Sequence, residues 1–327
     1  MKRKGKTMNF IDRVDPELRP LLPLMEQALG GISAANLPER RAAASAQLAA
    51  MKAKVPANTA VIMRDVQAAG PEGAPDVKVR VYAGKEKAGR PGILWIHGGG
   101  MIVGSIGADD GNCSTFAEQL DAVVVSVEYR LAPENPHPAP VEDCYAALVW
   151  MAAHANELGL DLTRIAVAGA SAGGGLAAAT ALLARDRGGP ALAFQCLTYP
   201  MLDDRNETPS SHEFTGIASW SREHNALGWS ALLCGKAGGA DVSMYAAPAR
   251  ATSLAGLPPA LIQVGELEVF RDEDMAYATR LMQAGVAAEL HVYAGAIHAW
   301  DMVAGAAVTQ RLRADRLAAL RRALVRA

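Results

Sequence analysis

Apolar and polar positions along this chain follow two patterns that alternate with one another. Short runs rich in β-branched residues lie at residues 77–82, 93–96, 122–128, 165–168, 194–198, 260–264 and 289–293. Longer Ala- and Leu-rich segments that repeat apolar residues every three or four positions lie at residues 140–155, 173–185, 272–284 and 306–325. The first pattern predicts strands, and the second predicts amphipathic helices. Because strands that alternate with helices are typical of βαβ units, we predict an α/β fold built on a mostly parallel sheet.

Two regions fall outside this alternation. Residues 1–55 contain helical segments with Pro20 and Pro23 near one start, and they precede the first predicted strand. Residues 203–240 form a long insertion between two predicted strands. The sequence therefore divides into N-terminal helices (1–55), an α/β core (56–202 and 241–327) and an insertion (203–240). We hypothesise that the helices and the insertion together form a lid.

The net charge and the length of the apolar runs bear on which kinds of molecule the protein binds. Lys and Arg total 32 while Asp and Glu total 34, so the formal net charge is −2. No long basic face marks the chain as a binder of nucleic acid or of an anionic membrane. The longest uncharged apolar run, residues 176–184, has about half of the roughly 18 residues that a spanning helix needs. We therefore expect a small neutral substrate, with no nucleic-acid or membrane partner.

The N-terminus and the cysteines indicate the compartment and the cofactor class. The N-terminal cations are Lys2, Arg3, Lys4 and Lys6. Asp12 and Arg13 then interrupt the region where a signal peptide needs an unbroken apolar stretch, so we expect a cytoplasmic protein. The widely spaced cysteines are Cys113, Cys144, Cys196 and Cys234. Because they form no CxxC pair, we expect buried free thiols and no metal or redox cofactor.

The strongest chemical signal is the segment Gly169-Ala170-Ser171-Ala172-Gly173, which joins a predicted strand directly to a predicted helix. This is the G-x-S-x-G pattern of a nucleophile elbow, in which a serine occupies a strained turn and glycines leave room for the neighbouring backbone. The following helix points its N-terminal amides at the serine, which favours negative charge there. A dinucleotide-binding turn would instead need glycine at position 171. We therefore predict that Ser171 is a nucleophile.

A second glycine-rich turn, His97-Gly98-Gly99-Gly100, follows another predicted strand. Acyl transfer places negative charge on a carbonyl oxygen, and glycine amides approach that oxygen without a side chain in the way. This is the HGGG form of an oxyanion loop. We expect Gly98, Gly99 and Ala172 to supply the oxyanion amides, and His97 to brace the loop by hydrogen bonds. An ordinary glycine turn with a core histidine is the alternative.

Only one histidine after the elbow stands where a general base is needed. Imidazole is the usual base because its pKa lies near neutrality. In enzymes with a nucleophile elbow, the triad residues follow one another along the chain as nucleophile, acid and histidine. The histidines after Ser171 are His212, His224, His291 and His298. The first two fall in the insertion, and His291 falls within a predicted strand. His298 follows the last predicted strand, so we predict that His298 is the base.

With these motifs in order, the chain resembles the hormone-sensitive-lipase family of bacterial esterases over residues 93–300. Besides the two glycine-rich turns and His298, the resemblance rests on Gly104, on Glu128-Tyr129-Arg130-Leu131-Ala132-Pro133-Glu134, on Tyr199-Pro200-Met201-Leu202-Asp203 and on residues 265–273. The resemblance implies an α/β-hydrolase fold with a mostly parallel eight-stranded sheet, helices on both faces and a helical cap. It further implies esters of short acyl chains as substrates, cis bonds at Ala132-Pro133 and His137-Pro138, and a homodimer through the strand near 289–293.

The acid of the triad is the least determined of the three residues. The resemblance points to Glu268, which lies after a predicted strand and 298 − 268 = 30 positions before His298. Similar enzymes usually have Asp at this position, although either acid serves in this fold. Asp272, which we expect to cap the following helix, and Glu266, which we expect to be structural, are the rivals.

These residues together predict a serine carboxylesterase that works through an acyl-enzyme intermediate and needs no cofactor. Hydrolysis of lactones or amides by the same residues is one alternative, because fold and triad do not distinguish these acyl donors. A non-catalytic receptor for a small ligand is another. Such receptors usually lose the histidine, whereas this chain keeps His298.

Overall fold

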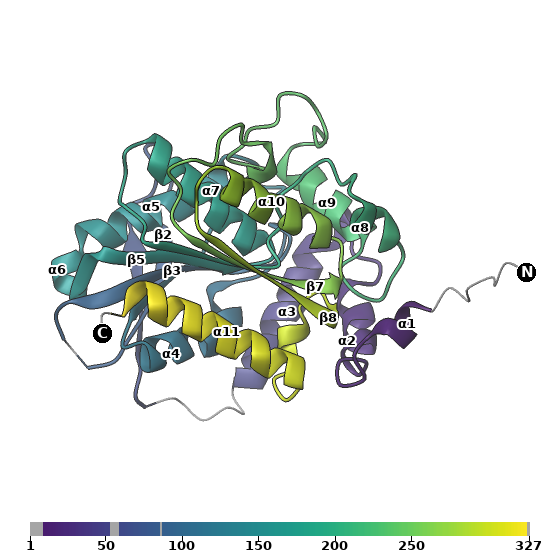
Figure 1. Cartoon of the computed structure of the whole chain (residues 1–327), viewed down its shortest axis with the longest axis horizontal. Coiled ribbons are helices and arrows are strands. Elements are labelled where there is room, and N and C mark those ends of the chain that lie inside the picture. The colour runs from purple at the N-terminus through teal and green to yellow at the C-terminus, as the bar shows by residue number, and fades with distance from the viewer. Residues whose placement is uncertain (1–8, 53–58, 86, 326–327) are drawn as a thin grey trace, which may run out of the picture.

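The computed structural model describes residues 9–52, 59–85 and 87–325 (Figure 1). The cationic residues Lys2 to Lys6, on which part of the expected compartment depends, lie outside the described residues. The same holds for the predicted boundary near residue 55 between the N-terminal helices and the core.

An eight-stranded sheet forms the centre of the molecule, as expected for an α/β-hydrolase fold. The strands are β1 (Ile62–Ala68), β2 (Val77–Ala83), β3 (Arg90–Ile96), β4 (Val123–Val127), β5 (Leu160–Ala170), β6 (Phe194–Thr198), β7 (Ala260–Leu267) and β8 (Ala288–Ile297). Their order across the sheet is β1-β2-β4-β3-β5-β6-β7-β8. The β1–β2 and β2–β4 pairs are antiparallel, and the remaining pairs are parallel. The prediction of a mostly parallel sheet is confirmed.

Strand β1 is the one strand of this sheet that the hydrophobic pattern does not reveal. It pairs with β2 at the edge of the sheet, and of its seven residues only Ala68 is fully buried. Ile62 and Met63 are exposed. Because an edge strand that packs little surface into the core needs no apolar run, its sequence carries no strand signal.

Helices cover both faces of the sheet (Figure 1). The helices are α1 (Phe10–Arg13), α2 (Leu21–Leu29), α3 (Leu37–Lys52), α4 (Asp110–Gln119), α5 (Ala139–Ala153), α6 (Ala155–Leu158), α7 (Ala172–Asp186), α8 (Pro209–Glu213), α9 (Arg222–Leu232), α10 (Arg271–Gln283) and α11 (Ala307–Leu324). Helices α4 and α11 lie on one face, whereas α5, α7 and α10 lie on the other. The four helices predicted for the core, α5, α7, α10 and α11, are confirmed to within two residues at each end. Helix α4, whose first turn is polar, was missed.

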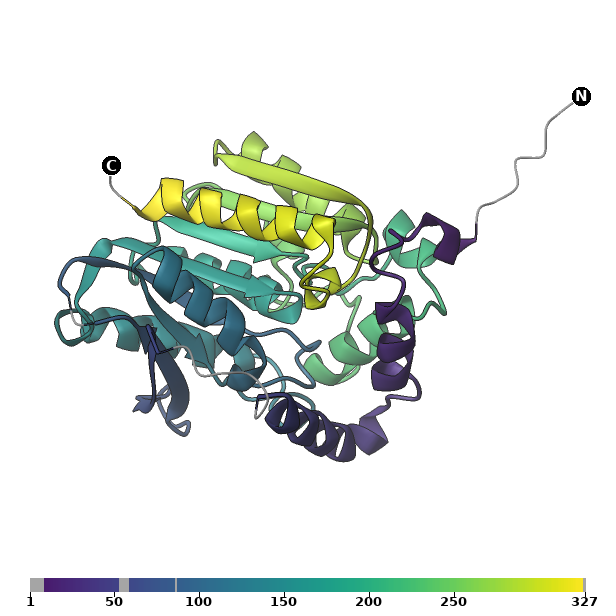
Figure 2. The ribbon, with the colours of Figure 1, turned by 90° about the horizontal axis from the view of Figure 1, so that it is seen from below.

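The N-terminal helices and the insertion gather at the same end of the sheet (Figure 2). Arg13 at the end of α1 pairs with Glu213 of α8 at 2.5 Å. The Ser219 hydroxyl donates a hydrogen bond to the Met25 sulfur at 3.9 Å. This contact joins the insertion to α2. Helix α3 is tied to the core, because the Arg41 Nε–H donates to the Ile102 carbonyl at 2.7 Å.

The structure also bears on the smaller expectations. Ala132-Pro133 and His137-Pro138 are cis, as predicted. Cys113, Cys144 and Cys196 are buried free thiols, but the expectation is wrong for Cys234, which is exposed. Cys234 lies in the turn that ends α9, with φ = 52°, so the chain leaves the packed face of the helix there. In the described part of the chain, no helix combines the length and apolar character needed to cross a bilayer.

The junction of β5 and α7 is packed so closely that glycine is required there. A Cβ on Gly173 would lie 2.1 Å from the Ile96 carbonyl oxygen and 2.4 Å from that of His97. Both are backbone atoms of the neighbouring chain segment at the end of β3. Since neither can turn away as a side chain can, the first turn of α7 lies directly against that backbone.

We predict that Gly173→Ala lowers the free energy of unfolding by at least about 2 kcal/mol, because the added methyl group overpacks a site walled by backbone. Chemical denaturation measures the change. The matched control is Gly305→Ala, where an added Cβ meets nothing within 4 Å. Equal stabilities of the two variants would contradict the packing described here.

Candidate active site

Ser171 lies at the turn between β5 and α7 in a conformation that non-glycine residues rarely adopt. Its φ and ψ are 57° and −124°, and the residue is 5% exposed. The loop after β6 holds this backbone from both sides. The Ser171 N–H donates to the Thr198 carbonyl at 2.9 Å, and the Met201 N–H donates to the Ser171 carbonyl at 3.0 Å. The strained turn expected of a nucleophile elbow is therefore present, at the N-terminus of α7.

The structure brings His298 to this serine. His298 follows β8, and its Nε2 lies 3.0 Å from the Ser171 Oγ. Tyr199 and Phe270 pack edge-on against the imidazole, with ring centroids 4.7 and 5.2 Å away. These aromatic walls hold the ring plane, so that Nε2 faces the hydroxyl and Nδ1 faces away from it.

Glu268 accepts the hydrogen bond on the far side of the imidazole. One carboxylate oxygen, Oε2, lies 2.6 Å from the His298 Nδ1, and the side chain is fully buried. The other oxygen, Oε1, accepts the Gly265 N–H at 2.6 Å. The side chain thus folds back onto the end of β7, which accommodates the methylene that Glu has beyond Asp. Ser171, His298 and Glu268 form one continuous hydrogen-bonded chain, the arrangement that acyl-transfer triads share.

The two rival acids are engaged elsewhere. The Asp272 Oδ2 accepts the Ser210 N–H at 2.7 Å, and its Oδ1 pairs with Arg271 at 2.7 Å. The expectation that Asp272 caps the next helix is wrong, because the N-cap residue of α10 is Phe270 and Asp272 lies inside the first turn. Glu266 is structural, since it accepts the Gly295 N–H at 3.0 Å.

Two buried acids of α10 lie near Glu268. Glu273 is 3% exposed, and its Oε1 accepts the Leu202 and Asp203 N–H groups at 2.8 and 3.1 Å. Asp274 is fully buried. Burial raises the pKa of both carboxyl groups well above the usual range. This shift favours the neutral form of both groups.

His97 braces the second glycine-rich turn, as expected. It is 1% exposed, and burial lowers its pKa, which favours the neutral imidazole. Because a carbonyl only accepts, the Nδ1–H donates to the Gly98 oxygen at 2.8 Å. Tyr129 stacks on the imidazole with ring centroids 4.2 Å apart, and its hydroxyl donates to the His97 carbonyl at 3.0 Å.

The turn after His97 presents its backbone to Ser171. A Cβ on Gly98 would lie 3.2 Å from the Ser171 Cβ, so the two residues are in direct contact. Gly99 has φ = 119°, and a Cβ there would lie 2.1 Å from the Val103 carbonyl oxygen. Ala172 is the first residue of α7, where helix amides have no intrahelical partner. The three residues expected to form an oxyanion hole are thus brought to one place.

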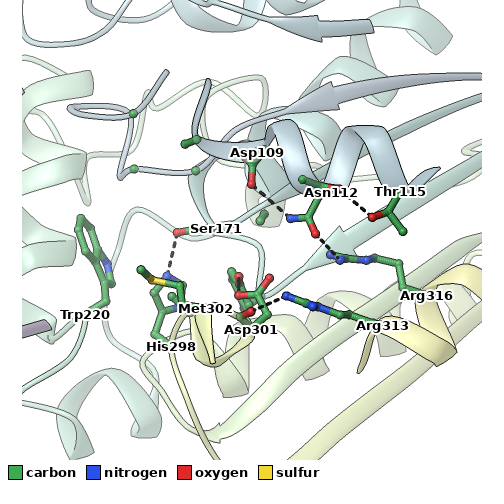
Figure 3. A pocket seen from close by; sticks show the side chains of 18 of the residues that line it. Asp109, Asn112, Thr115, Ser171, Trp220, His298, Asp301, Met302, Arg313 and Arg316 are labelled. Atoms are coloured by element: carbon green, nitrogen blue, oxygen red, sulfur yellow. Dashed lines mark hydrogen bonds between the residues drawn. The ribbon is translucent and has the colours of Figure 1, made fainter. Parts of the chain in front are cut away.

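A pocket of about 960 Å³ opens over Ser171 and His298 (Figure 3). On one side it is lined by Met25 and Leu29 of α2 and by Trp220 of the insertion. On the other side it extends between α4 and α11, where the residues labelled in Figure 3 are Asp109, Asn112, Thr115, Asp301, Arg313 and Arg316. Sequence reasoning identified none of the lining residues between α4 and α11 as functional. Their signal was weak, because they belong to separate helices and loops that only the tertiary fold brings together.

The described residues include no group of three or more His, Cys, Asp or Glu side chains arranged to hold a metal ion.

Comparison with known proteins gives concordant matches. A family model described as the alpha/beta hydrolase fold matches residues 93–302. The esterase LipI of Mycobacterium tuberculosis is 40% identical over 252 residues, which cover 74% of this chain and 75% of that protein. The carboxylesterase NlhH of the same organism is 40% identical over 265 residues, which cover 78% and 81%. The solved structure of a bacterial heroin esterase is 46% identical with a TM-score of 0.91, and the match covers 97% of this chain and 100% of that one.

We predict that Glu268→Gln lowers kcat by about 10³-fold or more with nearly unchanged stability, because the neutral amide no longer holds the imidazole tautomer that the serine needs. Asp272→Asn is the matched control, and it should retain most of its activity while its denaturation midpoint falls through loss of the Arg271 ion pair. Steady-state kinetics and chemical denaturation of both variants make the comparison. The reverse pattern would assign the acid to Asp272.

Proposed function

This chain belongs to the alpha/beta hydrolase family, as its resemblance to the bacterial esterases of the hormone-sensitive-lipase group implied, and on this premise we propose that it is a serine carboxylesterase for short-acyl esters. The observation that carries the proposal is the unbroken chain of hydrogen bonds from Glu268 through His298 to Ser171 at the floor of the pocket. Relatives named esterase and carboxylesterase support the same reaction class.

The proposed reaction begins when the Ser171 oxygen attacks the ester carbonyl and its proton passes to the His298 Nε2. Glu268 stabilises the positive imidazolium that results. The carbonyl oxygen becomes an oxyanion, which accepts hydrogen bonds from the amides of Gly98, Gly99 and Ala172. Removing one such donor typically costs about 3 kcal/mol of transition-state stabilisation. The glycine-rich loop therefore contributes to catalysis on a scale similar to that of the triad side chains.

Collapse of the tetrahedral intermediate then expels the alcohol, which takes the proton from His298, and leaves an acyl group on Ser171. In the second half, His298 takes a proton from water, the hydroxide attacks the acyl carbonyl, and the free acid leaves as Ser171 recovers its proton. The bonds made and broken balance without any other reagent.

Lactones and amides are the closest alternative substrates, because the same three side chains attack any acyl donor. Rates with a panel of aryl esters, lactones and anilides rank them directly. A non-catalytic receptor does not need Ser171, His298 and Glu268 to be hydrogen-bonded to one another. The intact triad therefore argues against the receptor hypothesis.

We extend the proposal to the domains and to the setting of the protein. Residues 1–55 and 203–240 act as a cap, which the contacts of Arg13 and Ser219 across the two segments support. The four free cysteines fit the cytoplasm, where thiols stay reduced. Two copies of the chain pair through β8, which lies at the edge of the sheet and exposes Val292. Nucleic acid is not a partner, because the formal net charge is −2.

We predict that Ser171→Ala lowers the hydrolysis of short 4-nitrophenyl esters below about a thousandth of the original rate, since the oxygen that forms the acyl-enzyme is gone. The control is Ser126→Ala, which makes the same change at a buried serine of β4 and should stay active. Release of nitrophenol is followed by absorbance. Burst kinetics that persist in Ser171→Ala would remove this serine from the mechanism.

We predict that deleting residues 1–55 lowers kcat/KM and shifts the preference among acyl chain lengths while the sheet stays folded, because Met25 and Leu29 line the pocket. Circular dichroism reports the fold, and rates across a series of acyl chains report the preference. Deleting residues 1–8 alone, which removes no residue of α1 to α3, is the control. Unchanged kinetics after the long deletion would refute a cap role for this segment.

A further inference from the structure

The part of the pocket between α4 and α11 has a chemistry that ester hydrolysis does not require. We call it the polar arm and define it by Asp109, Asn112, Thr115, Asp301, Arg313 and Arg316. In Figure 3, Trp220 lies on the opposite side of Ser171 and His298 from both arginines. The guanidinium groups of Arg313 and Arg316 reach from α11 toward Asp301 and Asn112, across the arm.

Arg316 carries a positive charge that no neighbouring carboxylate balances by contact. The residue is 1% exposed, and its Nη2 donates a hydrogen bond to the Asn112 Oδ1 at 3.2 Å. Its guanidinium lies over Phe116 and Trp95, 5.1 and 5.7 Å from the ring centroids. Within the part of the chain that the structure describes, the Nε and Nη1 groups have no hydrogen-bond partner. A buried arginine normally faces a carboxylate in direct contact, and Arg316 has none among these residues.

Arg313 lines the arm more openly than Arg316. It is partly exposed, and its Nη2 donates to the Asp301 carbonyl, a neutral acceptor, at 3.0 Å. Its Nε is buried without a partner. Within the described residues, neither Arg313 nor Arg316 forms an ion pair with an acid. The arm therefore contains two guanidinium groups that no carboxylate contacts, and the more accessible of the two is Arg313.

The two acids of the arm are hydrogen-bonded to neutral groups rather than to the arginines. The Asp301 Oδ1 accepts the Tyr199 hydroxyl at 2.6 Å. The Asp109 Oδ1 accepts from the Asn112 amide at 3.3 Å. Burial raises the pKa of Asp109, with the nearby charge of Asp301 acting in the same direction, so this carboxyl is shifted toward its neutral form.

We propose that the polar arm is an anion subsite, so that this enzyme takes esters whose acyl or alcohol part carries a carboxylate. Arg313 contacts that carboxylate, and Arg316 adds positive charge from the floor of the arm. An arginine fork matches a carboxylate in geometry as well as in charge. The inference rests on the proposed esterase function and names the substrate class of the same site.

Two matched series of esters test the subsite and separate the acyl side from the alcohol side. On the acyl side, the substrates are the 4-nitrophenyl esters of hexanoate, of adipate as its mono-ester, and of 5-(trimethylammonio)pentanoate. On the alcohol side, they are phenyl acetate, 4-carboxyphenyl acetate and 4-(trimethylammonio)phenyl acetate. Each series varies only the terminal group from neutral to anionic to cationic. The readout is the ratio of kcat/KM for the anionic ester to that for the neutral ester.

We expect this ratio to exceed about tenfold in one of the two series for the unmodified protein. Arg313→Met should lower the ratio about tenfold, and Arg313→Glu should bring it below one while raising the rate with the cationic ester. The matched control is Arg311→Met, which removes the same charge from α11 at a residue that stacks on Tyr293 outside the pocket. It should leave the ratio unchanged. Added salt should lower the ratio in the unmodified protein, because it screens the attraction.

The other possible outcomes reject either the anion subsite or the esterase function. A ratio of one or less in both series, or a ratio that Arg313→Met does not change, overturns the subsite while hydrolysis of the neutral esters leaves the proposed esterase function intact. A preference for the cationic esters also overturns it and identifies Asp109 and Asp301 as the recognition groups. Failure to hydrolyse any ester in either series rejects the esterase function itself, and the subsite with it.

Discussion

The backbone of Ser171 is held at a positive φ by the segments that close around it, and the site depends on that constraint. A non-glycine residue in such a region carries strain of order 1–3 kcal/mol, which the surroundings must offset. They do so through the Thr198 and Met201 hydrogen bonds and through contacts at Gly173 that exclude any side chain. The same contacts align the first amides of α7 with the turn at Gly98. One tight junction therefore places both the serine and the groups around it.

Around this junction, the triad and the pocket are built by different parts of the chain. The three triad residues follow strands of the same half of the sheet: Ser171 follows β5, Glu268 follows β7 and His298 follows β8. The carboxyl ends of parallel strands lie at the same edge of a sheet. These three residues therefore come together regardless of which helices and loops surround them. The pocket walls come from α2, the insertion, α4 and α11. Reaction chemistry and substrate choice can therefore change separately in this fold.

The sequence predicted the centre of the molecule better than its periphery. Strands β2 to β7 and helices α5, α7, α10 and α11 bury many apolar residues, which leave clear apolar runs or periods in the sequence. Strand β1 and helix α4 bury less and left no such period. Exposure of Cys234 depends on where α9 ends, and composition does not encode that. The role of Asp272 was misplaced because a first-turn acid and an N-cap acid lie one or two positions apart in sequence.

What the sequence determined by itself was the local chemistry: an elbow serine, a glycine turn and a histidine in the order that this fold requires. Such signals are readable because each depends on residues that are neighbours along the chain. Only the tertiary structure shows that Glu268, and not Asp272, lies within hydrogen-bonding distance of His298, because acids close in sequence differ only in where the fold places them. It alone also made the polar arm, since Arg313 and Asp109 are some two hundred positions apart and become neighbours only when α11 packs beside α4.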